Sequence, residues 1–173
     1  TQSASLTSQF NQRLLAADKA GGLVADEVEQ LEGLSADEIA TAAQAAAEKG
    51  LNDRWLIPLL NTTQQPALSA LTNRQTRENL FKAGWERTQK GDENDTRELI
   101  TRLTALRARQ ATLLGFADYA SWSTADQMAK TPAAALAFMR GIVPAARARA
   151  ARELADIQKV IDDEQGGFTA QAW

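Results

Sequence analysis

The sequence predicts an all-α protein: an antiparallel bundle of about six to eight helices with one short strand near residues 54–60. Two observations carry the class. Alanine and other helix-favouring residues are abundant, and only four prolines occur among 173 residues. Apolar side chains recur three and four residues apart through most of the chain, which is the period of amphipathic helices. A hydrophobic share of 44% is enough to bury a core without disulfides or metal.

Composition excludes several kinds of site. The sequence contains no cysteine and no histidine, so these residues supply no disulfide, thiolate nucleophile, Ser-His-Asp triad or His-ligated zinc. Its 19 basic and 22 acidic residues are mixed along the same predicted helices, which is not the basic stripe that nucleic acids require. No apolar run has the length of a membrane span, and Thr1 opens no signal peptide. We expect neither nucleic acid nor membrane as a partner.

The first fifty residues predict N-terminal helices. Apolar spacing indicates one helix over residues 5–19, stopped by Gly21-Gly22, and a short helical turn over residues 26–32. Ser35 and Glu38 then form a capping box, in which each side chain accepts a hydrogen bond from the other residue's backbone amide. A third helix should therefore start at residue 36 and continue to residue 49.

Residues 51–61 contain the predicted strand. The run RWLIPLL at 54–60 is mostly aromatic and aliphatic, and Pro58 disfavours a helix interior. A single strand cannot satisfy its backbone groups, yet the sequence shows no second convincing strand. Its partner should then lie outside these residues, or the strand is an exposed edge. Both alternatives suggest a piece of a larger protein.

Helices dominate again over residues 66–165. A polar connector over 61–65 leads to Pro66, which suits the first turn of a short helix. Thr72 and Gln75 form a second capping box, and the helix that they open should end at Gly91.

The next predicted helix starts at a capping pair, Asp95 and Glu98, and closes at Gly115. One apolar stripe runs along it, formed by Leu99, Leu103, Leu106, Gln110 and Leu113.

The last long helix has a clear start, because Thr131 is a good N-cap and Pro132 suits the first helical position. Pro144 should break or kink it. Beyond Pro144 a coiled-coil-like seam consists of Ala150, Leu154, Ile157 and Ile161. Residues 166–173 form a tail with two aromatic residues and no core of its own.

Two polar groups are candidate sites, and each has a plainer structural explanation. Asp92 and Asn94 resemble part of a calcium loop, but the glycine and terminal glutamate of that motif are absent, so a solvated turn is favoured. A possible anion patch consists of Arg97, Arg102, Arg107 and Arg109. Ordinary surface ion pairs explain most of these arginines, as Glu98 does for Arg102.

Two further groups also favour structural roles. Asp162 and Asp163 are adjacent rather than on one helix face, which does not suit a general acid/base dyad. Trp55, Trp85 and Trp122 could line a ligand groove, although aromatic residues at such spacing are more often core. We therefore predict no catalytic and no metal-binding residue, and we assign no substrate-binding residue.

A family resemblance extends this interpretation. The segments that carry it are NTTQQPAL, NDTRELI, ATLLGFADYA, DQMAKTP and IVPAARARA, and it continues to GGFTAQAW. Together they resemble the central helical region of bacterial peptidyl-dipeptidases (dipeptidyl carboxypeptidases), in the zinc metallopeptidase family of thimet oligopeptidase and oligopeptidase A. The resemblance covers essentially the whole chain and is less distinctive before Leu31.

The resemblance implies a large, mostly helical, two-lobed enzyme that removes C-terminal dipeptides from oligopeptides through a deep channel. In that family two histidines of H-E-x-x-H and a later glutamate hold the zinc. None of these ligands can be assigned here, because the chain has no histidine. Residues 1–173 would then be one helical region, truncated at both ends, that forms a non-catalytic channel wall, with zinc held elsewhere in the parent enzyme. The family favours a cytoplasmic location, with the periplasm as the alternative.

A second hypothesis is a stand-alone helical protein-binding module that only resembles a peptidase. It predicts a well-folded monomer with a defined partner. The fragment hypothesis instead predicts apolar surface exposed by truncation, and hence a tendency to dimerise.

Overall fold

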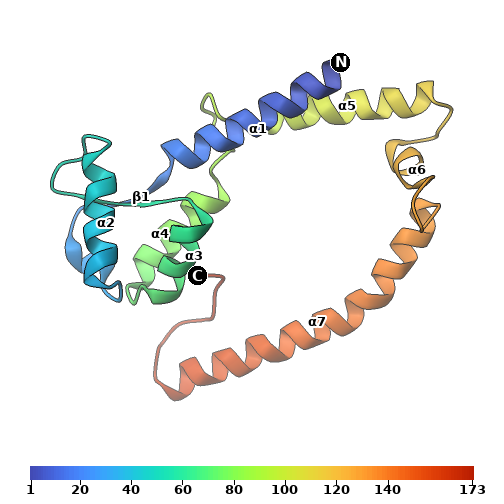
Figure 1. Cartoon of the computed structure of the whole chain (residues 1–173). Helices are drawn as coiled ribbons and strands as arrows, with labels where there is room; N and C mark the ends of the chain where they lie inside the picture. The colour runs from blue at the N-terminus through green and yellow to red at the C-terminus, as the bar shows by residue number, and fades with distance from the viewer. The chain divides into compact units, whose positions relative to one another are not determined.

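The structure, a computed structural model, describes residues 1–173 and confirms the all-α class. Seven α-helices are present, which lies within the expected number, and two short strands form the one sheet (Figure 1). The chain divides into two compact units: residues 1–103 together with Trp173, and residues 104–172. Each unit is described separately.

The first unit contains most of the short elements. In chain order these are α1 (Gln2–Ala20), β1 (Gly22–Ala25), the 3-10 turn η1 (Val28–Leu31), α2 (Ala36–Ala47), β2 (Trp55–Pro58), α3 (Asn61–Ala70) and α4 (Arg74–Trp85). Helix α5 (Arg97–Leu113) begins in this unit and continues into the second. The second unit then contains α6 (Tyr119–Thr124) and the 32-residue α7 (Pro132–Asp163).

The predicted strand exists as β2, but the expectation about its partner was wrong. β2 pairs antiparallel with β1, which places Leu23 opposite Ile57 and Gly22 opposite Pro58. β1 is only four residues long and includes one glycine and one alanine, which are weak strand formers, so its sequence gave little signal. A Cβ at Gly22 would lie 2.9 Å from the Ile57 carbonyl oxygen. The glycine that was interpreted as a helix stop is thus also what lets the strands approach.

The sheet contributes buried side chains to the main core. Buried side chains from the strands, η1, α2, α3 and α4 form one apolar cluster around Leu31, Leu71 and Leu80, which are almost completely inaccessible to solvent. Packing between α2 and β2 and between α3 and α4 closes this cluster. The core therefore rests on helices that cover a minimal two-stranded sheet.

Two predicted helix starts are confirmed. The Ser35 hydroxyl accepts from the Glu38 amide, and the Glu38 carboxylate accepts from the Ser35 amide at 2.8 Å, so α2 begins with the expected capping box. The Thr131 hydroxyl accepts from the Ala134 amide at 3.2 Å, and Pro132 occupies the first position of α7.

Helix α3 begins five residues before the predicted start. The segment interpreted as a polar connector is its first turn, and Pro66 lies inside the helix. Proline removes the hydrogen bond to the carbonyl four residues earlier, which is that of Thr62. Both Thr62 and Pro66 are exposed, so water can satisfy that carbonyl. The Thr63 hydroxyl donates to the Pro58 carbonyl at 2.8 Å and joins the new start to β2.

Helix α4 differs from the prediction at both ends. Its N-cap is Asn73, which accepts from the Thr76 amide at 3.1 Å, whereas Thr72 bonds to the Glu32 carbonyl through its amide and its hydroxyl. The helix ends at Trp85, six residues before Gly91. A tertiary contact at Thr72 therefore replaced the local cap that the sequence suggested.

The last two long helices bury less than their patterns suggested. On α5, Leu99 is buried, but Leu113 at the other end of the predicted stripe is 79% exposed. Pro144 does not interrupt the assignment of α7, and no residue of α7 is buried. Pro144 and Arg140 are both exposed, so the carbonyl that lacks an intrahelical partner faces water.

Candidate functional site

A mostly apolar groove in the first unit is lined by α2, β2 and α3 and has a volume of about 260 Å³. Leu56, Ile57 and Pro58 of β2 contribute to it, as do Ala42 and Ala45 of α2, so the surface is mostly apolar. The remaining lining residues are Leu34, Glu38, Thr41, Thr62, Thr63, Pro66 and Ala67. The small side chains of α2 leave this hollow open, because no long side chain fills it.

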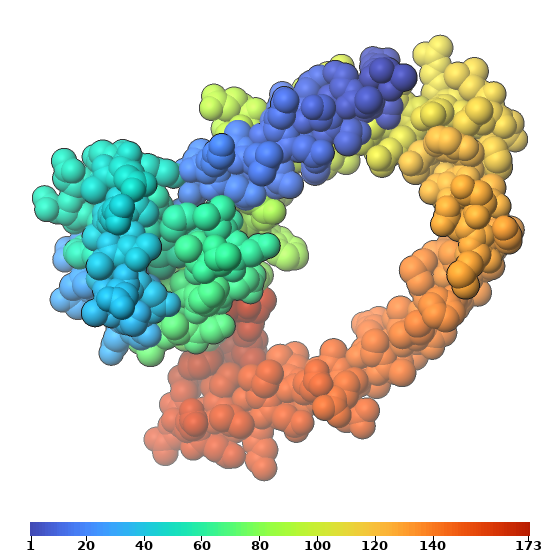
Figure 2. All heavy atoms as spheres, in the orientation of Figure 1, coloured from blue at the N-terminus to red at the C-terminus, as the bar shows by residue number.

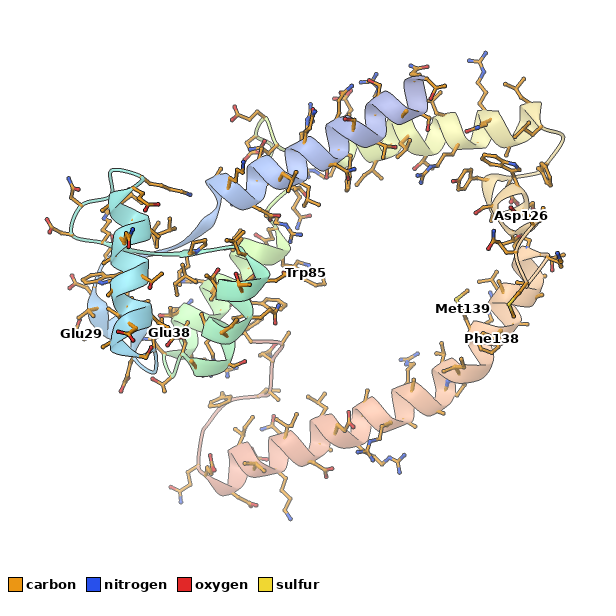
Figure 3. All side chains as sticks on the ribbon, viewed as in Figure 1. Glu29, Glu38, Trp85, Asp126, Phe138 and Met139 are labelled. Atoms are coloured by element: carbon orange, nitrogen blue, oxygen red, sulfur yellow. The ribbon has the colours of Figure 1, made fainter.

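Glu38 is the one ionisable residue that lines the groove, and its carboxylate accepts hydrogen bonds from Ser35. Its Oε2 atom accepts from the Ser35 amide at 2.8 Å and from the Ser35 hydroxyl at 2.7 Å. These bonds, the hydroxyl first, lower the pKa of Glu38 below its ordinary value. Figure 3 labels Glu38 on α2. An ionised capping carboxylate does not suit a general acid, and the groove is otherwise a mostly apolar surface.

The turn between α4 and α5 is a cluster of polar residues that hydrogen-bond to one another. The Asp95 carboxylate accepts from the Gly91 amide at 2.8 Å and from the guanidinium and backbone amide of Arg97. These bonds, with the Arg97 side chain as the largest cause, hold the pKa of Asp95 well below its ordinary value. Arg13 of α1 donates to the Asp95 carbonyl.

The possible calcium loop is this same turn. The Asp92 carboxylate accepts from the Asn94 amide at 3.0 Å, and Asp95 binds Arg97. Its oxygens therefore serve backbone amides and a guanidinium, as in an ordinary capped turn. No group of three or more His, Cys, Asp or Glu side chains in the structure is arranged to hold a metal ion.

The four arginines of α5 do not form one patch. At about 100° per residue, positions 97, 102 and 107 point to three different sides of a helix, whereas Arg109 shares the side of Arg102 about 10 Å further along. Arg97 pairs with Asp95, and Arg102 lies 3.8 Å from Glu98. Arg107 stacks its guanidinium 5.1 Å from the centre of the Tyr119 ring. Each of these three cations thus has a different neighbour.

Within the first unit Trp55 and Trp85 differ in burial, and Trp85 departs from the expected core role. Trp55 packs against the core cluster, whereas Trp85 is 75% exposed and stacks on Phe81 at 5.7 Å (Figure 3). Trp122 lies in the second unit and meets the Tyr119 ring edge-on at 5.5 Å. Asp162 and Asp163 end α7, and the Asp162 carboxylate accepts from the Gln158 side chain at 2.8 Å.

Sequence reasoning missed two hollows. One is the α2–β2–α3 groove, whose signal was an alanine-rich helix followed closely by the strand. The other lies beside α6, where Phe116, Tyr119 and Trp122 gather near Asp126. Neither is lined by histidine, cysteine or lysine, and both offer apolar or aromatic surfaces for contact.

Comparison with known proteins identifies relatives for the whole chain. The family model described as Peptidase family M3 matches residues 67–173. All 173 residues align with dipeptidyl carboxypeptidase of Escherichia coli at 67% identity and with that of Salmonella typhimurium at 65%. Oligopeptidase A of Escherichia coli is 30% identical over 178 aligned positions. The chain spans about a quarter of the length of each of these relatives: 25%, 25% and 26%.

Proposed function

Because the chain belongs to peptidase family M3, we propose that it is a helical, non-catalytic part of a zinc metallopeptidase that releases C-terminal dipeptides from oligopeptides. The observation that carries the proposal is the 67% identity with a dipeptidyl carboxypeptidase across all 173 residues. The identity with oligopeptidase A is 30%, which favours the dipeptidyl carboxypeptidase branch.

The residues of this chain do not fit a zinc site. Protein zinc centres use cysteine, histidine and carboxylate ligands, and the first two are absent from the sequence. The carboxylates present do not gather in groups of three. We therefore place the zinc ligands and the water-activating base in the part of the protein that aligns with the other three quarters of the relatives.

The role that we assign to this chain is a wall of the channel that admits unfolded peptides. Two features support it. Helices α5 and α7 are 17 and 32 residues long and present most of their side chains to the surface. The hollows described above offer apolar and aromatic contacts without a reacting group. Such surfaces can exclude folded proteins sterically and still leave the chemistry to residues elsewhere. No helix in the structure combines the length and apolar character of a membrane span. On the family resemblance alone we propose the cytoplasm as the location, with the periplasm as the alternative.

The test compares two proteins, the natural gene product and the 173-residue chain alone. An antibody against this chain recovers the natural gene product, whose mass, zinc content and peptide products are measured by mass spectrometry. We expect a protein about four times longer than 173 residues, with bound zinc, that shortens an oligopeptide two residues at a time from its C-terminus. The 173-residue chain alone should bind no stoichiometric zinc and release no dipeptide.

The substrate arm tests the wall itself. One oligopeptide is supplied in two forms: free, and fused directly to the C-terminus of a folded protein without a linker. Only the free peptide should be shortened. Stoichiometric zinc and dipeptide release by the chain alone would contradict the division of labour. A natural product of 173 residues that hydrolyses nothing would instead favour the stand-alone binding module.

A further inference from the structure

One face of α7 forms a long apolar surface to which the proposed function assigns no role. The helix has no buried residue, although it carries many large apolar side chains. Those exposed by at least two fifths are Leu136, Phe138, Met139, Ile142, Val143, Leu154, Ile157 and Val160. Monomeric proteins rarely leave a continuous apolar surface of this kind in water.

Helical geometry places all of these except Phe138 on one side. At about 100° per residue, they fall with Ala146, Ala150 and Ile161 in a sector about 120° wide, which is the face of a helix that packs on a neighbour. From Leu136 to Ile161 successive residues along the middle of the face are three or four positions apart, as in helices that pack along their length. At about 1.5 Å per residue the 32-residue helix is about 48 Å long, and the face from Leu136 to Ile161 extends along about 38 Å of it.

One charged residue, Glu153, lies within this apolar face. Its carboxylate accepts from the Arg149 side chain at 2.7 Å, so the charge is already paired at the edge of the face. The other charged residues of α7 lie outside the sector. Apart from Glu153, the sector therefore carries no charge between Leu136 and Ile161.

The curvature of α7 agrees with this division. Pro144 lies about 140° from the centre of the apolar face, on the polar side. A helix bends away from a proline ring, and helices curve with the convex side towards solvent and the concave side towards a core. Figure 1 shows α7 as a curved helix, and in Figure 3 the labelled Met139 lies on its concave side. The apolar face is therefore the inner side of the curve.

We propose that the apolar face of α7 is an internal interface, covered by an apolar helical surface of the same polypeptide that lies outside residues 1–173. The length of the relatives supports this occupant, because three quarters of each lies outside the aligned region. The family model and the identity both extend through α7, so this face belongs to the family's own sequence. The small Ala146 and Ala150 at mid-length allow the covering surface to approach closely there. The inference rests on the part of the proposed function that makes this chain a segment of a longer protein.

The absence of cysteine from the chain gives a clean test. Single cysteines are placed on the face as Met139→Cys and Ile157→Cys, with matched controls two residues away on the polar side as Ala137→Cys and Lys159→Cys. Reaction with a maleimide is followed residue by residue by peptide mass spectrometry. The four variants are prepared in the longer natural protein and in the 173-residue chain, and circular dichroism confirms that each is folded.

In the longer protein we expect the two face cysteines to react at least about tenfold more slowly than their controls, because labelling must wait for local opening. In the chain alone all four should react at similar rates, whatever the protein concentration. Equal rates in the longer protein would overturn the proposal, as would a natural product that ends at residue 173.

Labelling of the 173-residue chain alone tests the two other surfaces that could cover the apolar face. Protection there at low concentration would mean that residues 1–103 cover the face, and protection that grows with concentration would mean a second copy; either result overturns the proposal. Dipeptide release is measured on the same samples. An active protein with equal labelling refutes only this interface, whereas an inactive protein with protected face cysteines refutes only the proposed function.

Discussion

Residues 1–103 and helix α7 show two different relations between sequence and burial. Fourteen of the fifteen buried hydrophobic residues lie in residues 1–103, and the other is Ala111. Helix α7 has an N-cap and a regular apolar period, yet none of its residues is buried. Figure 2 draws its heavy atoms as spheres, in orange to red. Local signals are therefore enough to define a helix, while its stability depends on a surface to pack against. The three predictions below test this difference in the 173-residue chain, from the largest expected effect to the smallest.

Truncating an apolar side chain should give the largest difference in stability between residues 1–103 and α7. Leu80 is completely buried in the core cluster, whereas Leu154 on α7 is 53% exposed. Leu80→Ala should lower the free energy of unfolding of residues 1–103 by about 2–5 kcal/mol, since it leaves a cavity. Leu154→Ala should change it by less than about 0.5 kcal/mol. Urea unfolding followed by tryptophan fluorescence measures both. Equal losses would mean that α7 shares the core.

Removing a helix cap should give a smaller version of the same contrast. Ser35 caps α2, which packs on β2, and Thr131 caps the unburied α7. Ser35→Ala should lower the free energy of unfolding by about 1 kcal/mol, because the Glu38 amide loses its acceptor. Thr131→Ala should leave that transition unchanged and reduce only the helical circular dichroism signal. Ser35→Thr keeps a hydroxyl acceptor and should restore most of the loss; a failure to do so would point to a packing role for Ser35.

The turn before α5 should give the smallest effect, and one that depends on pH. The pKa of Asp95 is lower in the folded state than the unfolded value of about 3.9, chiefly because the Arg97 side chain donates to its carboxylate. The ionised form therefore stabilises the fold above pH 4, and this contribution is lost as the pH falls through the lowered pKa. The melting temperature of Asp95→Asn should lie furthest below that of the original chain at pH 7.

This difference in melting temperature should narrow progressively below about pH 4. Arg97→Gln removes the partner and should show the same narrowing, and the double variant should be little worse than either single variant at pH 7. A difference that stays constant from pH 7 to pH 2 would mean that the charge of Asp95 is not what stabilises the turn.

Three local motifs were interpreted correctly, whereas the capping box assigned to Thr72 and Gln75 was not. The capping box at Ser35, the Thr131-Pro132 start and the helix before Gly21 all appear in the structure. The four candidate-site groups resolve into pairs and turns that sequence spacing could only partly foresee. The preference for a capped turn at Asp92 agrees with its bond to the Asn94 amide, whereas a core role for Trp85 does not agree with its exposure.

The sequence by itself determined the helical class, the starts of α2 and α7 and the absence of histidine, because these depend on composition or on contacts within one turn of helix. Only the tertiary structure decided that Gly22–Ala25 pairs with β2, that Thr72 bonds to Glu32 rather than capping α4, and that α3 continues through Pro66. Thr72 and Glu32 are 40 residues apart, and the two strands are separated by a comparable length of chain. No local pattern encodes such a contact, because its energy arises when the folded chain brings distant backbone groups together and removes them from water.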